Sequence, residues 1–150
     1  MSERRARSAN GKRRELSRPR DEAGPIGERE MSRYLLDKFL FCVDRDPELV
    51  ERYRDDPAGT VTWWEAERAN GILNCHAAES STWLAFTDAE RQALSTHDYP
   101  ALFEMGAHPF LTLTLFIAMF ERDYDEPLGF QLEYARKLAH FTLPYADIAT

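Results

Sequence analysis

The sequence lacks most of the short motifs that mark disulfide-linked, metal-binding or catalytic proteins. It contains only two cysteines, Cys42 and Cys75, in 150 residues, which excludes a disulfide framework and a cysteine-type zinc site. It also has no glycine-rich phosphate loop and no serine-nucleophile motif. We therefore expect a reduced, cytoplasmic protein in which each cysteine is a small buried apolar residue. A single disulfide between the two is the less favoured alternative.

Long apolar runs are missing too, so we do not expect the chain to span a membrane. Charge is plentiful but uneven. The net charge is −7, yet residues 1–30 hold nine Lys or Arg against six acids and contain no aromatic side chain. We predict that residues 1–30 form a disordered basic leader and that residues 31–150 form one helical domain. A nucleic-acid-binding arm is the alternative for the leader, but the acidic remainder argues against nucleic acid as the main partner.

The stretch from residue 87 to 120 carries three sets of helix start and stop signals. Thr87 and Glu90 form a capping box, in which each side chain accepts a hydrogen bond from a free backbone amide at the start of the helix. Asp98 can cap a second helix, and Gly106 suits the left-handed residue that ends it. These signals predict three consecutive short helices.

The third of these helices begins at Pro109 and is the most apolar segment of the chain. Burial of each large side chain contributes about 1.5–3 kcal/mol, so we expect this helix at the centre of a core or against a partner. A strand over residues 111–115 is the alternative, but a length of about twelve residues favours the helix. The apolar residues are Phe110, Leu111, Leu113, Leu115, Phe116, Ile117, Met119 and Phe120.

Apolar residues at helical spacing predict four further helices. Their expected ranges are 32–43, 47–55, 63–78 and 127–143. We expect Asp56-Pro57 to stop the second of them and a capping box of Thr62 with Glu65 to start the third. The predicted fold is therefore all-α, a compact bundle of about five to seven short helices around a central apolar helix.

Four histidines invite a search for a metal site. His76 and Glu79 are three residues apart, which places them on one face of a helix. A di-iron site in a helical bundle, however, needs a second such pair and further carboxylates. Cys75 and His76 cannot act as a nucleophile pair, because adjacent helical residues point apart. We expect no metal and no catalytic residue in this chain, and we interpret His108 as a helix cap or as part of a shared cleft.

The capped segment resembles a known family. The pattern Glu-Arg-x-Ala-Leu, then Asp-Tyr, a glycine and an apolar helix is similar to the small, LigA-type alpha subunit of protocatechuate 4,5-dioxygenase, one of the extradiol ring-cleavage dioxygenases. Weaker similarity extends over most of residues 31–132. The residues that carry the resemblance are Glu90, Arg91, Ala93, Leu94, Asp98, Tyr99, Ala101, Gly106, His108, Phe110 and Leu111.

This resemblance implies an all-helical subunit that covers the active site of a large beta subunit. In such enzymes the Fe(II), with its two histidine and one carboxylate ligands, belongs to the large subunit, which opens a protocatechuate-like catechol. The small subunit contributes an aromatic side chain near the substrate. The Gly-Phe-Gln pattern implies that role for Phe130. His108, opposite the Gly106 turn, is the second candidate for the substrate pocket. An ordinary core residue is the alternative for Phe130, because extra residues around 117–123 separate it from the central helix.

The chain also has more aromatic residues than a lone small bundle needs, so we expect a large obligate interface with the beta subunit. The expected anchors are Trp63, Trp64, Trp83, Tyr99 and Phe110, with Tyr34, Phe103 and Phe141 as further candidates. The alternative function is a noncatalytic docking or recognition domain of the same fold that serves another enzyme, for example a peptide-modifying one. The short final segment, LPYADIAT, does not look like a modifiable peptide, which favours the dioxygenase subunit.

Overall fold

The structure, a computed structural model, describes residues 26–79 and 83–141, and in the first helix it describes side chains from Ser32 onward. These residues form seven α-helices and two short 3-10 helices without a strand, so the all-α prediction is confirmed. None of the described helices is both long and apolar enough to cross a membrane. The helices are α1 (Ile26–Asp44), α2 (Pro47–Asp55), α3 (Pro57–Glu67), α4 (Asp88–Ser95), α5 (Tyr99–Glu104), α6 (Pro109–Phe120), η1 (Glu121–Asp123), α7 (Gly129–Leu138) and η2 (Ala139–Phe141).

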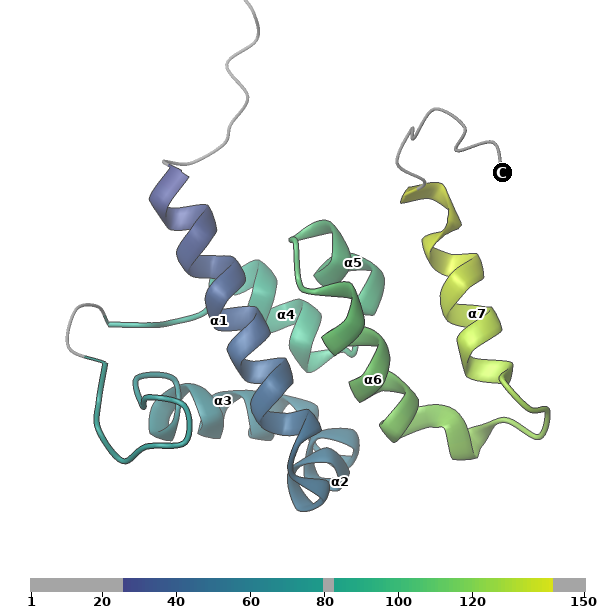
Figure 1. Cartoon of the computed structure of the whole chain (residues 1–150), viewed down its shortest axis with the longest axis horizontal. Helices are drawn as coiled ribbons and strands as arrows, with labels where there is room; N and C mark the ends of the chain where they lie inside the picture. The colour runs from purple at the N-terminus through teal and green to yellow at the C-terminus, as the bar shows by residue number, and fades with distance from the viewer. Residues whose placement is uncertain (1–25, 80–82, 142–150) are drawn as a thin grey trace, which may run out of the picture.

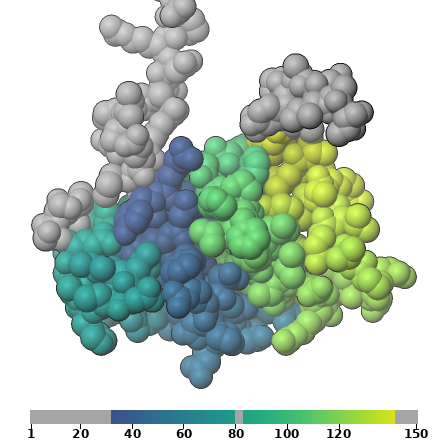
Figure 2. Space-filling model, in the orientation of Figure 1, coloured from purple at the N-terminus to yellow at the C-terminus, as the bar shows by residue number. Residues whose placement is uncertain are grey.

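Helix α6 lies at the centre of the bundle, between α1 and α7 (Figure 1 and Figure 2). It packs against α1, α2, α5 and α7, while α3 packs against α2 and α4. The prediction of a central apolar helix is therefore confirmed. The side chains that α6 buries are Thr112, Leu115, Phe116 and Met119. Its first turn is at the surface, where Phe110 remains 65% exposed.

Two clusters of aromatic rings fill the core. In the first, the ring of Phe39 on α1 meets Tyr53, Trp64 and Phe86 edge-on, with centroid distances of 5.1, 5.2 and 5.9 Å. Edge-on pairs of this kind add about 0.5–1.5 kcal/mol each to the free energy of burial. The second cluster joins α5, α6 and α7, and its rings are Tyr99, Phe116, Phe120, Phe130 and Tyr134.

Five of the helices begin at a capping side chain, which explains where each of these helices starts. The capping side chains are Asp46, Asp56, Thr87, Asp98 and His108. Each accepts a hydrogen bond from a backbone amide that has no partner within its helix. The predicted capping box at the start of α4 is present with both of its hydrogen bonds.

The predicted boundaries between residues 56 and 78 are wrong. Asp56 closes α2 and also starts α3, because its carboxylate accepts from the amide of Gly59 at 2.9 Å. Thr62 therefore lies inside α3, where its hydroxyl donates to the carbonyl of Ala58 at 2.9 Å instead of forming a capping box. The helix then ends at Glu67, and residues 70–79 form a loop where a helix was predicted.

The two outer helices also differ from the predicted ranges. Helix α1 begins at Ile26, earlier than the expected residue 32 and inside the predicted leader. Helix α7 begins at Gly129 instead of Pro127, because Leu128 adopts a left-handed conformation with φ of 62°. The predicted disorder of residues 1–25 and the predicted helix end at Pro144 lie outside the described residues.

Candidate functional site

We call residues 90–111, which carry the family resemblance, the family-like segment. Most of the residues that carry the resemblance have structural roles within the chain. Glu90 is 2% exposed, and its carboxylate accepts from the amide of Thr87 at 2.8 Å and from the hydroxyl of Ser32. Leu94 and Tyr99 are buried in the core. The segment therefore determines how α4, α5 and α6 pack, and it leaves few side chains free to act on another molecule.

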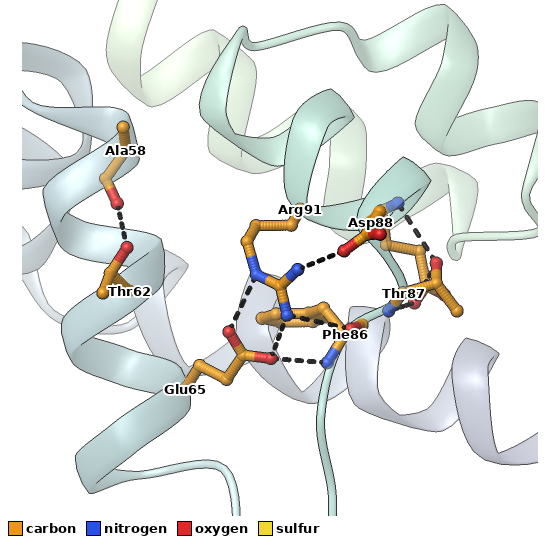
Figure 3. A network of polar contacts seen from close by, with 8 residues as sticks. Ala58, Thr62, Glu65, Phe86, Thr87, Asp88 and Arg91 are labelled. Carbon is orange, nitrogen blue, oxygen red and sulfur yellow. Dashed lines mark hydrogen bonds and ion pairs between the residues drawn. The ribbon is translucent and has the colours of Figure 1, made fainter.

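Arg91, the second residue of the segment, ties α4 to α3 (Figure 3). Its Nε and Nη2 donate to the two carboxylate oxygens of Glu65 at 3.0 and 2.8 Å, and its Nη1 donates to Asp88 at 2.9 Å. The amide of Phe86 also donates to Glu65, at 2.8 Å, which holds the extended segment before α4 in the same network. The hydrogen bonds from Arg91 lower the pKa of the Glu65 carboxyl below its usual value. The guanidinium of Arg91 and the carboxylate of Glu65 thus neutralise each other within the fold.

The family-like segment is exposed to solvent at the start of α6, beside α1. Gly106, with φ of +93°, turns the chain there, and the carboxylate of Asp37 accepts from the amide of His108 at 2.6 Å. The Nδ1 of His108 accepts from the amide of Phe110 at 3.2 Å, so the neutral imidazole carries its proton on Nε2. We call the exposed residues His108, Pro109 and Phe110 the 108–110 surface.

Phe130 lies in the core, not at an open pocket. It is 2% exposed, and its ring packs against those of Tyr99, Phe120 and Tyr134 with centroid distances of 5.8 to 6.0 Å. The prediction that Phe130 lines a substrate pocket is therefore corrected. Because α7 buries only Phe130 and Tyr134, this ring instead attaches α7 to the rest of the bundle.

Two of the five predicted interface anchors are core residues. Trp64 and Tyr99 are 1% and 5% exposed, so their predicted role at an interface is wrong. Trp63 is half-buried, and the guanidinium groups of Arg52 and Arg68 lie 4.3 and 5.7 Å from its ring centroid. These cation–π contacts cover Trp63 within the chain.

The other two predicted anchors lie at the surface. Trp83 is 87% exposed just before α4, and Phe110 is 65% exposed at the start of α6. Aromatic residues are enriched at protein interfaces, and tryptophan is enriched among binding hot spots. Their interface role remains a prediction.

A cleft of about 510 Å³ lies between α1, the end of α3 and the loop that follows α3. One wall is formed by Lys38, Phe41 and Cys42, which share a face of α1, and by Arg45, the first residue after that helix. The remaining lining residues are Asp46, Leu49, Trp64, Arg68 and 71–76. We call this feature the α1–loop cleft.

Hydrogen bonds to α1 hold the loop in place. The Nζ of Lys38 and the hydroxyl of Tyr34 both donate to the carboxylate of Glu79, at 2.7 and 2.6 Å, at the base of the loop. At its tip, Nη1 of Arg45 donates to the side-chain oxygen of Asn74 at 3.3 Å. Partial burial alone would raise the pKa of Glu79, but the hydrogen bonds from Lys38 and Tyr34 lower it, so this carboxylate stays charged. The loop is thus a preformed wall of the cleft.

The cleft is better suited to binding than to nucleophilic chemistry. Cys42 is half-buried, and burial raises the pKa of its thiol, against the opposing effect of the Trp64 N–H. A neutral thiol is a weak nucleophile. Cys75 is exposed, which corrects the expectation that both cysteines are buried, and both are free. Within residues 26–79 and 83–141 no group of three or more His, Cys, Asp or Glu side chains could hold a metal ion.

The cleft was not predicted from the sequence, because residues 63–78 were expected to form one helix instead of a helix end and a loop. Two signals were present. Asn70 and Gly71 are poor helix formers in the middle of that range. Lys38, Cys42 and Arg45 are also spaced four and three residues apart, which predicts a polar, partly basic stripe along one side of the first helix and the residue after it.

Comparisons of the chain with protein-family models, with curated proteins and with solved structures give no match.

Proposed function

We propose that this chain is the small helical subunit of a two-subunit extradiol dioxygenase that opens a protocatechuate-like catechol. In this proposal the chain covers the active site of a large beta subunit, which carries the Fe(II) and its ligands. The chain supplies no metal ligand and no catalytic group. Its contribution is to exclude water from the shared pocket and to complete the wall around the aromatic substrate.

The observation that carries the proposal is the position of the 108–110 surface. Most other residues that resemble the family are used within the chain, as the contacts of Glu90 and Arg91 illustrate. His108 and Phe110, in contrast, point outward from a rigid helix start that Asp37 and Gly106 hold in place. A segment that positions two outward side chains so firmly suits a docking role.

The two side chains offer complementary contacts. The ring of Phe110 presents apolar surface that a partner or an aromatic substrate can bury. The Nε2–H of His108 is a hydrogen-bond donor, suited to a carboxylate or phenolate oxygen of the substrate or to a carbonyl of the partner. Together they favour a pocket that accepts a polar aromatic molecule.

A noncatalytic docking domain that serves another enzyme is the second candidate. Glu90, Arg91 and Leu94, which carry part of the family resemblance, stabilise the fold of this chain. The fold would need these residues whichever protein it binds, so the resemblance is also compatible with a different partner. The two candidates share the 108–110 surface and differ in the protein that binds it. The identity of that protein therefore separates them.

The test is co-purification with an extradiol large subunit from the same genome. We expect Phe110→Ala to weaken the complex about tenfold or more, because a buried aromatic anchor is lost. Leu132→Ala is the matched control, since Leu132 is 68% exposed on α7 and should leave the affinity unchanged. Iron content of the large subunit should not depend on either change. Absence of a complex would refute the dioxygenase proposal, and a complex insensitive to Phe110→Ala would refute the role of the 108–110 surface.

A further inference from the structure

We infer that the α1–loop cleft binds a small monocarboxylate that carries an apolar body. This inference does not depend on the proposed function, because it concerns an open cleft lined by residues of this chain alone. Its volume of about 510 Å³ falls within the range of small-molecule pockets, roughly 300–1,000 Å³. Its chemistry follows from the charges of its walls, the indole N–H of Trp64 and the apolar side chains.

The charges in the cleft favour a single negative charge. Lys38 is neutralised by Glu79 at 2.7 Å. Arg45 and Arg68 pair with none of the described carboxylates, and Asp46 is the one acid among the lining residues. Two guanidinium groups and one carboxylate leave about one positive charge to be balanced, which matches a monoanion. Guanidinium groups bind carboxylates through paired N–H donors.

The two arginines are held near the cleft by contacts that leave N–H donors free. Arg45 lies over the ring of Phe41 at 4.9 Å, and its one hydrogen bond to a described residue runs from Nη1 to Asn74. Arg68 lies beside the ring of Trp63 at 5.7 Å. A guanidinium carries five N–H donors, so both retain donors for a ligand. The aromatic contacts restrict both exposed side chains before a ligand arrives, which lowers the entropic cost of binding.

A buried donor with only a weak acceptor supports the same conclusion. Trp64 is 1% exposed and lines the cleft, and its Nε1–H has no oxygen or nitrogen partner among the described residues. Its neighbour is the thiol of Cys42, which also lines the cleft, and sulfur is a weak hydrogen-bond acceptor. A ligand oxygen that displaces this thiol would accept a stronger hydrogen bond from the indole.

The remaining walls are apolar. Phe41 and Leu49 contribute from α1 and α2, and Ile72 and Leu73 contribute from the loop, where Ile72 is 43% exposed. Inorganic phosphate or a sugar phosphate would leave these side chains without a partner. A carboxylate on a ring or a short alkyl chain satisfies the guanidinium groups and the apolar walls together.

Binding is tested on the full chain with benzoate as the probe and benzamide as its neutral counterpart of the same shape. We expect benzoate to bind below about 10 mM, and benzamide and inorganic phosphate to bind at least about tenfold more weakly. Titration calorimetry gives the affinities. The indole N–H signal of Trp64 in proton–nitrogen NMR, assigned by comparison with Trp63→Phe and Trp83→Phe, should shift on addition of benzoate and not of benzamide.

Variants assign the binding to the cleft. Arg45→Gln and Arg68→Gln should each weaken benzoate about tenfold, while Arg136→Gln, an exposed change on α7, should have no effect. Retained folding of each variant is checked by circular dichroism. The inference is overturned if benzoate does not bind, if benzamide or phosphate binds equally well, or if the double variant of Arg45 and Arg68 binds benzoate as the wild-type chain does.

Discussion

Replacing Phe130 by alanine separates a core role from a role at a substrate pocket. The ring is 2% exposed and touches the rings of Tyr99, Phe120, Tyr124 and Tyr134. Truncation of a buried phenylalanine removes its burial energy and leaves a cavity, at a cost of about 3–5 kcal/mol. We therefore expect Phe130→Ala to lower the free energy of unfolding by about 3 kcal/mol or more.

Leu132, two residues further along α7, is the matched control. Its side chain is 68% exposed, so Leu132→Ala should change the free energy of unfolding by less than about 0.5 kcal/mol. Urea titration followed by circular dichroism measures both values, and hydrogen exchange shows whether α7 opens first. If Phe130→Ala were as stable as Leu132→Ala, the ring would not anchor α7, and a site facing a substrate would become the better interpretation.

Three further results are expected. Gly106→Ala should cost about 1–2 kcal/mol, because φ of +93° is strained for a residue with a side chain, and thermal unfolding measures the loss. Glu65→Gln and Arg91→Met should show a coupling energy of about 1 kcal/mol in a double-mutant cycle, and additive effects would contradict the network of Figure 3. Burial lowers the pKa of the His97 imidazole below 6.5, so the unfolded chain binds that proton more readily. The free energy of unfolding should then fall as pH drops below about 6.5, and His97→Gln should reduce this loss in urea titrations at about pH 7.5 and 5.5.

Much of the fold could be predicted because local signals and tertiary packing agree. The caps at Thr87, Asp98 and His108 satisfy backbone amides through side chains only a few residues away, so they can be identified without knowledge of the rest of the chain. The burial of the central part of α6 follows from its composition alone. At Asp56 the same kind of signal was misinterpreted, because one aspartate can both end a helix and start the next.

The site residues were harder to predict because exposure depends on contacts between distant segments. Trp64, Tyr99 and Phe130 are large aromatic residues, and their sequence neighbours do not reveal whether they face solvent or a core. The α1–loop cleft depends on a non-helical loop that is held by Lys38 and Arg45, 31 and 29 residues away from their partners Ala69 and Asn74. No short sequence pattern encodes such a contact.

The most direct test of the proposed function is ring-cleavage turnover of protocatechuate in the presence of Fe(II), measured for this chain alone, for the large subunit alone and for the two together. We predict no turnover by this chain alone, more turnover by the pair than by the large subunit alone, and a loss of that gain with Phe110→Ala. Turnover by the isolated chain, or a pair no more active than the large subunit by itself, would contradict the account of a helical cover over a partner's metal centre.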